Sequence, residues 1–137
     1  MRVFIDANVV MDMLLKRKHY KSAQAIFSLA EKGVIRLYIS SLTYAIISYH
    51  LLKQYNIKDC IEILRILYQN YNTLSFSKEA VKKALYSSFR DIEDGYQYFV
   101  AKEYNIPIII TRNTKDFLVD DLSVITPEQF LNMYRKQ

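Results

Sequence analysis

The sequence predicts an α/β protein with three layers (α/β/α) around a central, mostly parallel sheet of four to five strands. Short runs of β-branched and aromatic residues alternate with longer segments in which apolar residues recur at helical spacing. Because helices separate the strands, the strands are expected to pair in parallel, with both faces of the sheet covered. The run 107–111, "PIIIT", is almost continuously apolar, which is typical of a strand buried on both sides.

The amino-terminal elements begin with the strand 2–5, "RVFI". A helix follows over 8–15, where Val9, Val10, Met13 and Leu14 recur at helical spacing. A second helix covers roughly 20–32 and stops at Gly33, and the strand 34–40, "VIRLYIS", comes next.

The middle of the chain repeats this order. The segment 40–55 opens with hydroxyl residues that can cap a helix and continues as a mostly apolar helix. A further helix over about 57–70 precedes a short strand, 73–76. Ser77 then caps a helix that runs to about Ser87.

In the last third, Asp91 caps a helix over about 92–104, and the fourth strand covers 107–111. After a turn, a short fifth strand, 122–126 ("LSVIT"), leads to the terminal helix. That helix starts at 126–128, where a threonine cap is followed by proline in the first helical position.

Composition limits the class of protein. The chain has 137 residues, little Gly or Pro, and no apolar run of membrane-spanning length, so we expect one domain over 1–137 and no membrane segment. The single cysteine, Cys60, cannot form an internal disulfide, which suits a reducing cytoplasm. The formal charge of +5 favours polyanionic partners without identifying one.

Acidic residues follow or precede the predicted strands at one end of the sheet. In a parallel α/β sheet, ligands bind beyond the carboxyl ends of the strands, near the point where strand order reverses. The residues expected there are Asp6, the group Asp91, Glu93 and Asp94, and Asp116, with amide oxygens from Asn8 and Asn113. Such a convergence is costly unless a hard cation lies among the oxygens, and Mg²⁺ or Mn²⁺ is the usual occupant.

Other chemistries find no motif in the sequence. His19 and His50 are isolated, so no zinc spacing exists. A glycine-rich phosphate loop and a serine nucleophile elbow are also missing. Metal-assisted hydrolysis is the chemistry that remains.

Each acid also has a purely structural interpretation. Asp6 can cap the helix that begins near Asn8, and Asp91 can cap the helix after it. Asp94 would then occupy the third helical position, where a negative charge favours the helix dipole, and Asp116 can be a turn residue. The site hypothesis rests on the joint placement of Asp6, Asp94 and Asp116 at one edge.

With these acids, the sequence resembles the PIN domain family, the ribonuclease fold of many bacterial toxin–antitoxin toxins. The resemblance lies in "VFIDANVVMDMLLKR", "DIEDGYQYFVAKEYNIPIIITRNTKDF" and "VITPEQFL", and it covers nearly the whole chain. It implies a PIN-like three-layer fold, divalent-metal-dependent hydrolysis of RNA, a homodimer and inhibition by a cognate antitoxin.

The resemblance also implies roles for particular residues. Asp6, Asp94 and Asp116 match the family's acids that bind the divalent metal. Within "DIED", Asp94 is a better match than Asp91, because Ala101 stands seven residues after it, as the family's small helical residue does.

Residues beside these acids receive supporting roles. Asn113 is expected to hold a metal-bound water, and Thr111 to form a hydrogen bond with a neighbouring carboxylate. Arg112 and the basic run 16–18, Arg17 included, are expected to attract the RNA backbone; the run can equally be a solvated helix end.

One departure from the family concerns the helix after the second strand. The family usually places a glutamate there, whereas 44–47 read Tyr-Ala-Ile-Ile. Asp12 or Asp91 could compensate, and one metal or two could bind. The departure motivates an alternative function: a degenerate PIN-like module that binds RNA or a protein partner without cleavage.

A phosphatase or phospho-receiver domain also uses acids at strand ends, but it predicts a lysine on the last strand, and "LSVIT" has none. The helices around 42–54 and 57–70 are apolar over more than one face. That pattern predicts a dimer interface or a groove for an antitoxin peptide, unless a thick core accounts for it.

Overall fold

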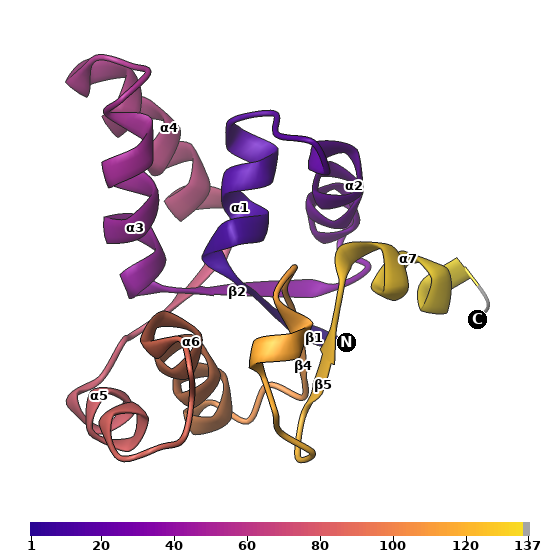
Figure 1. Ribbon diagram of the computed structural model, residues 1–137. Helices are drawn as coiled ribbons and strands as arrows, with labels where there is room; N and C mark the ends of the chain where they lie inside the picture. Colours follow the sequence, from indigo (N-terminus) through magenta and orange to yellow (C-terminus); the bar gives the residue numbers. More distant parts are fainter. Residues whose placement is uncertain (136–137) are drawn as a thin grey trace.

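The computed structural model describes residues 1–135, and its elements follow the predicted order (Figure 1). In chain order they are β1 (Arg2–Ile5), α1 (Ala7–Leu14), α2 (Tyr20–Glu31), β2 (Arg36–Ser40), α3 (Ser41–Leu51), α4 (Ile57–Asn70), β3 (Asn72–Leu74), α5 (Lys78–Leu85), α6 (Ile92–Glu103), β4 (Ile108–Ile110), the 3₁₀ turn η1 (Thr114–Asp116), β5 (Ser123–Ile125) and α7 (Pro127–Arg135). Within residues 1–135, no helix has the length and apolar character needed to cross a bilayer.

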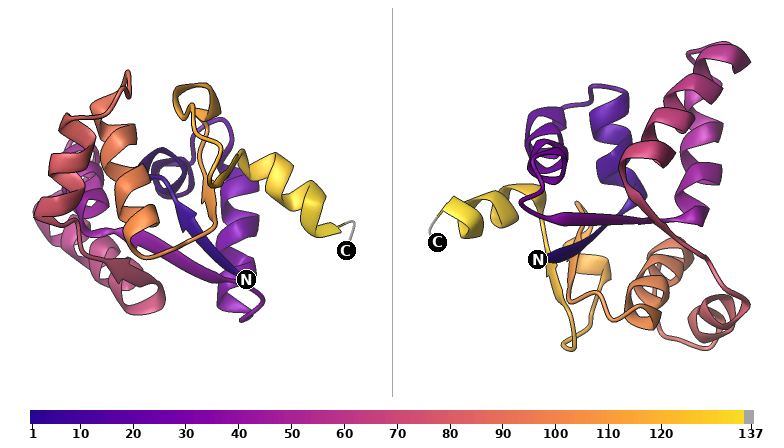
Figure 2. Two further views of the ribbon diagram at one scale, coloured as in Figure 1. Left: turned by 90° about the horizontal axis from the view of Figure 1, so that it is seen from below. Right: turned by 180° about the vertical axis from the view of Figure 1, so that it is seen from behind.

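The strands form one five-stranded sheet in the order β3-β2-β1-β4-β5, and every neighbouring pair is parallel. Helices α1 to α4 lie on one side of this sheet, whereas α5 and α6 lie on the other (Figures 1 and 2). The predicted α/β/α layering with a parallel central sheet is therefore confirmed.

The core is divided between the two faces of the sheet, because successive strand side chains point to opposite sides. Ile5 and Ile110 join the cluster beneath α1 and α2, while Phe4 and Ile109 join the cluster beneath α6. All four side chains are fully buried. This double burial confirms the interpretation of "PIIIT" as a strand covered on both faces.

Four of the five strands are shorter than predicted; β4 and β5 each lose one residue at either end, and β2 and β3 differ for identifiable reasons. β2 begins at Arg36 because the turn that closes α2 extends to Val34. There Gly33 adopts a positive φ of 75°, and the backbone N–H of Val34 donates to the carbonyl of Leu29 at 3.0 Å. β3 ends at Leu74, and the N–H of Phe76 donates instead to the hydroxyl of Ser41 at 2.9 Å.

The strand order fixes where a site can form. From the central strand β1 the chain first adds β2 and β3 on one side, and later β4 and β5 on the other. The order therefore reverses between β1 and β4, and the loops that leave these two strands diverge. In open α/β sheets such a point is the usual location of a ligand site.

Candidate active site

Asp6 directly follows β1, and both of its carboxylate oxygens accept hydrogen bonds. Oδ1 accepts a hydrogen bond from the N–H of Ala7 at 2.7 Å, so Asp6 is the N-cap of α1. Oδ2 accepts a hydrogen bond from the Thr111 hydroxyl at 2.7 Å, just beyond the end of β4. The side chain is only 4% exposed. Asp6 therefore both caps α1 and lies buried at the switch point, the place between β1 and β4 where the strand order reverses.

Asp94 lies in the first turn of α6 and is also 4% exposed. The cap of this helix is Asp91, whose Oδ1 accepts hydrogen bonds from the N–H groups of Glu93 (2.9 Å) and Asp94 (3.3 Å), as its position predicted. The Oδ2 atom of Asp94 is buried and has no hydrogen-bond partner among residues 1–135. Because leaving a carboxylate oxygen unsatisfied is costly, this atom points to a ligand in the adjacent space.

That space is a cavity of about 80 Å³ that Asp6 and Asp94 share. Asn8 and Asn113 line it as well, so the predicted amide oxygens lie at the same edge. Its remaining lining residues are Ala7, Met11, Ile46, Asp91, Glu93 and Gln97. Asp91 and Glu93 are exposed and form its outer side, whereas Asp6 and Asp94 are buried within it.

Electrostatics set these two buried acids apart from ordinary carboxylates. Burial, followed by the negative charges of Asp6, Asp91, Asp116 and Glu93, raises the pKa of Asp94 to about 7. Burial also raises the pKa of Asp6 to about 6, although the hydrogen bonds from Thr111 and Ala7 oppose the rise. A pair of acids in this state favours either a proton or a cation in the cavity.

Asp116 lies beside this cavity and does not line it. It ends η1, where its N–H donates to the carbonyl of Asn113 at 3.0 Å, and its side chain borders a neighbouring cavity of about 560 Å³. Its charge still contributes to the raised pKa of Asp94. In residues 1–135, no three His, Cys, Asp or Glu side chains converge closely enough to form a metal cage.

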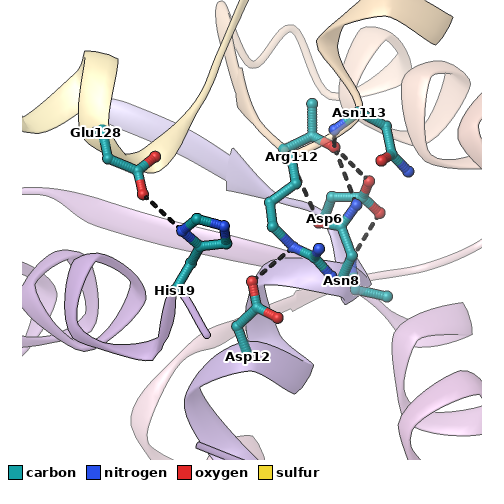
Figure 3. A network of polar contacts seen from close by, with 9 residues as sticks. Asp6, Asn8, Asp12, His19, Arg112, Asn113 and Glu128 are labelled. Atoms are coloured by element: carbon teal, nitrogen blue, oxygen red, sulfur yellow. Dashed lines mark hydrogen bonds and ion pairs between the residues drawn. The ribbon is translucent and has the colours of Figure 1, made fainter. Parts of the chain in front are cut away.

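A hydrogen-bond network joins the strand ends around Asp6 (Figure 3). The Thr111 hydroxyl, which donates to Asp6, also accepts from the N–H of Asn113 at 3.1 Å and from Nδ2 of Asn8 at 3.3 Å. The N–H of Arg112 donates to Oδ1 of Asn8 at 3.4 Å. The residues following β4 are therefore tied to the start of α1.

The structure adds one polar residue that the sequence did not single out. Gln97 lies three residues after Asp94 on α6, is 1% exposed and lines the same cavity. Its Nε2 donates to the Thr43 hydroxyl on α3 at 3.0 Å, while its Oε1 has no partner. The spacing of three residues after a candidate acid was the available signal, because it places both side chains on one helix face.

The helix that lacks the family's glutamate does reach the cavity, but with an apolar side chain. Among residues 44–47, Ile46 is the one that lines it. Asp12 does not line it. Its Oδ2 lies 2.6 Å from Nε of Arg112, in an ion pair (Figure 3). Arg17 is close to Asp12, since its N–H donates to the Asp12 carbonyl at 3.0 Å, and it also lies outside the cavity lining.

The donor set is compatible with a hard divalent cation. The cavity offers carboxylate and amide oxygens, one buried carboxylate oxygen is unsatisfied, and no thiol or imidazole lines the space. Mg²⁺ commonly binds through one or two carboxylates and keeps several waters, so a complete protein cage is not required. Asp6 and Asp94 are the residues that would hold such an ion.

Comparison with known proteins agrees with this architecture. The family model described as PIN domain matches residues 2–115. Ribonuclease VapC1 of Aquifex aeolicus (strain VF5) is 30% identical over 136 residues, which cover 94% of this chain and 92% of that protein.

Two solved structures share the fold. DNA-bound VapBC from Salmonella typhimurium has a TM-score of 0.71 at 14% identity, covering 93% of this chain and 98% of that chain. A toxin-antitoxin complex from Klebsiella pneumoniae has a TM-score of 0.68 at 22% identity, covering 91% and 97%. The chain belongs to the PIN domain family.

Proposed function

We propose that this protein is a divalent-metal-dependent endoribonuclease and the toxin of a toxin–antitoxin pair. The observation that carries the proposal is the shared cavity at the switch point, where buried Asp6 and Asp94 have raised pKa values and Asp94 keeps one unsatisfied oxygen. The ribonuclease name of the Aquifex relative supports the activity. The toxin–antitoxin complex of similar fold supports the biological role.

The chain's own residues would divide the work of phosphodiester hydrolysis. Asp6 and Asp94 would hold Mg²⁺ or Mn²⁺, with Asp116 acting from the neighbouring cavity wall. When bound, the ion lowers the pKa of a coordinated water and neutralises charge that develops on the phosphate. The Thr111 hydroxyl keeps the Asp6 carboxylate in one orientation, and the Asp91 cap fixes the turn that carries Asp94.

The remaining cavity residues would control the water. The free oxygen of Asp94 is placed to accept a proton from the attacking water. Asn8 and Asn113 would hold further waters at the rim, while the apolar side chains of Met11 and Ile46 limit solvent on the inner side.

A homodimer and a cognate antitoxin are the proposed protein partners. Helices α3 and α4 form a pair that extends beyond the edge of the sheet (Figure 1). They and the turn between them expose large apolar side chains: Tyr49, Leu52, Tyr55, Ile57, Ile61, Ile66 and Tyr68. Several exposed apolar side chains on one pair of helices are typical of a protein interface.

A second function is favoured by one observation, the apolar Ile46 on the helix where the family carries a glutamate. With that acid replaced, the protein would bind RNA or a protein partner through the same edge of the sheet without cutting. Glu93 and Gln97 oppose this alternative, because they add a carboxylate and an unpaired amide oxygen to the same cavity.

Cleavage of single-stranded and structured RNA in Mg²⁺, Mn²⁺ or EDTA separates the two functions. We expect cleavage by the wild type with either metal and none in EDTA. We expect Asp6→Asn to lose cleavage while its RNA binding remains. RNA binding without cleavage under every metal condition would favour the non-cleaving module.

A further inference from the structure

An ion pair between the buried Asp12 and the exposed Arg112 lies outside the active-site cavity lining and takes no part in the proposed chemistry. Asp12, on α1, is 1% exposed, and its Oδ2 is 2.6 Å from Nε of Arg112, in the loop that follows β4. The charge of Arg112 lowers the pKa of Asp12, whereas burial, the larger effect, raises it. A buried carboxylate is tolerated when a cation faces it, and Arg112 is that cation.

This pairing holds Arg112 in one orientation (Figure 3). Its backbone N–H is bound to Asn8, and its Nε faces Asp12. Within residues 1–135, no hydrogen bond or ion pair engages its Nη1 or Nη2. The side chain is 35% exposed, so this end of the guanidinium is open to a ligand.

Arg112 lines a cleft of about 300 Å³ together with His19, Asn113, Thr126 and Glu128. Asn113 lines the active-site cavity too, so the cleft and that cavity share a wall. On the far side, Nδ1 of His19 is 3.6 Å from Oε1 of Glu128 (Figure 3). The cleft therefore adjoins the acidic cavity, and its lining includes an arginine that Asp12 and Asn8 restrain.

We propose that this cleft is the binding site for the RNA phosphate next to the scissile one, with Arg112 as its ligand and Asp12 as the residue that positions Arg112. The guanidinium is a planar fork that binds a carboxylate on one edge and a phosphate on another. The proposal rests on the proposed ribonuclease function for the position of the scissile phosphate. Binding of an RNA backbone at the cleft does not itself require cleavage.

Binding of a short, fluorescein-labelled single-stranded RNA, measured by anisotropy in EDTA over a series of salt concentrations, tests the proposal without metal or catalysis. We expect Arg112→Ala to weaken binding about tenfold. The slope of log affinity against log salt should also fall by about 0.7, the value for one phosphate contact on a single strand. Arg112→Lys should recover the slope but only part of the affinity, because lysine keeps the charge and loses the fork.

Three further variants make the test specific. Glu128→Gln removes a negative charge from the cleft at constant size and should tighten RNA binding. Asp12→Asn frees the guanidinium without changing its charge, and should weaken binding while keeping the salt slope. Arg65→Ala, an arginine exposed on α4, is the matched control and should change neither quantity.

The double variant Asp12→Asn/Arg112→Ala distinguishes RNA binding by Arg112 from a purely structural role as the partner of Asp12. Arg112→Ala alone leaves Asp12 buried without its partner, so its melting temperature should fall. The double variant should regain much of that stability and still bind RNA as weakly as Arg112→Ala. Recovery of wild-type binding in the double variant would overturn the proposal.

The two proposals fail in distinguishable ways. If no RNA is cleaved but Arg112→Ala loses affinity and salt slope, the ribonuclease function fails and the cleft proposal stands. If Arg112→Ala binds RNA with wild-type affinity and slope, the cleft proposal is wrong whether or not cleavage is observed.

Discussion

Asp6 and Asp94 share a cavity, but the protein treats their oxygens differently. Both oxygens of Asp6 accept hydrogen bonds, from Ala7 and Thr111, whereas Oδ2 of Asp94 accepts none. The orientation of Asp6 is therefore fixed by the fold. Asp94 retains the atom with which a cation or a water can bind.

The raised pKa values of these acids predict how the stability of the metal-free protein depends on pH. Unfolded aspartates titrate near 3.8, whereas Asp6 and Asp94 titrate near 6 and 7 in the folded protein. Between about pH 4 and 7 the folded state thus binds more protons than the unfolded state. Its free energy of unfolding must then fall as pH rises, by about 1.4 kcal/mol for each unit by which a pKa is raised.

Thermal unfolding in EDTA across this pH range measures the effect. We expect the melting temperature to fall toward neutral pH, and Mg²⁺ or Mn²⁺ to restore it because the ion binds only the folded protein. Asp94→Asn should remove much of the slope. A metal-free protein whose melting temperature rises steadily from pH 4 to 7 would contradict this electrostatic account.

Gln97 is predicted to tune the metal affinity of the same cavity. Gln97 lines the cavity with Asp94, and its Oε1 has no hydrogen-bond partner among residues 1–135. Gln97→Glu would place a further carboxylate there and should tighten Mn²⁺ binding, measured by calorimetry, at some cost to metal-free stability. Gln97→Leu should weaken it about tenfold, as loss of a supporting ligand partner does. Equal affinities in both variants would limit Gln97 to its hydrogen bond with Thr43.

Among the elements, α6 is the helix whose first turn carries a candidate metal ligand, Asp94. Asp91 caps it through the N–H groups of Glu93 and Asp94, so the cap and the buried acid belong to one turn. Asp91→Ala should lower the free energy of unfolding by about 1 kcal/mol, and the loosened turn should weaken metal binding.

Asp91→Ser distinguishes a cap from a metal ligand at this position. Serine also caps helices well, so this variant should keep both the stability and the Mn²⁺ affinity of the wild type. If Asp91→Ser folds normally but loses metal binding, then Asp91 is a ligand and the capping explanation is insufficient. Chemical denaturation and calorimetry provide the two measurements.

The elements were predictable from the sequence because their signals are local. Helical apolar spacing, the caps at Ser77 and Asp91, and the apolar run before Thr111 each act within a few residues. The residues at which β2 begins and β3 ends were less predictable. Their ends depend on the geometry that closes α2 at Gly33 and on the long-range hydrogen bond from Phe76 to Ser41.

The site was predictable in part for the same reason. Asp6 and Asp94 could be placed at one edge from the order of strands, yet their burial and shared cavity depend on packing. The partner of Asp12 lies far away in the sequence, at Arg112, so no local pattern could identify it. Asp116 borders a different cavity because η1 turns the chain after Asn113. No sequence pattern predicted the course that the chain takes after Asn113.

At the scale of the whole molecule, the exposed side of α4 is expected to join two copies of the chain. Ile57, Ile61 and Tyr68 are exposed on this helix at spacings that place them along one stripe. Ile61→Glu should lower the mass measured by light scattering from dimer to monomer. Lys58→Glu, a larger change of charge (two units against one) at an exposed position of the same helix, should leave the dimer intact. A monomeric wild type would refute the homodimer.

The fold as a whole brings Asp6 and Asp94 to one cavity. The parallel sheet joins β1 to β4, so Asp6 meets Thr111, 105 residues later in the chain, at 2.7 Å. α6 then brings Asp94 to the same cavity. The central claim is that these two carboxylates together support metal-dependent RNA cleavage.

The rate of RNA cleavage as a function of Mn²⁺ concentration, in the wild type, Asp6→Asn and Asp94→Asn, tests this claim most directly. We expect a saturable rate in the wild type that EDTA abolishes. We also expect a loss of about a hundredfold or more in each variant, although both remain folded at the assay temperature. Cleavage that persists in EDTA, or that survives in either folded variant at the wild-type rate, would contradict the claim.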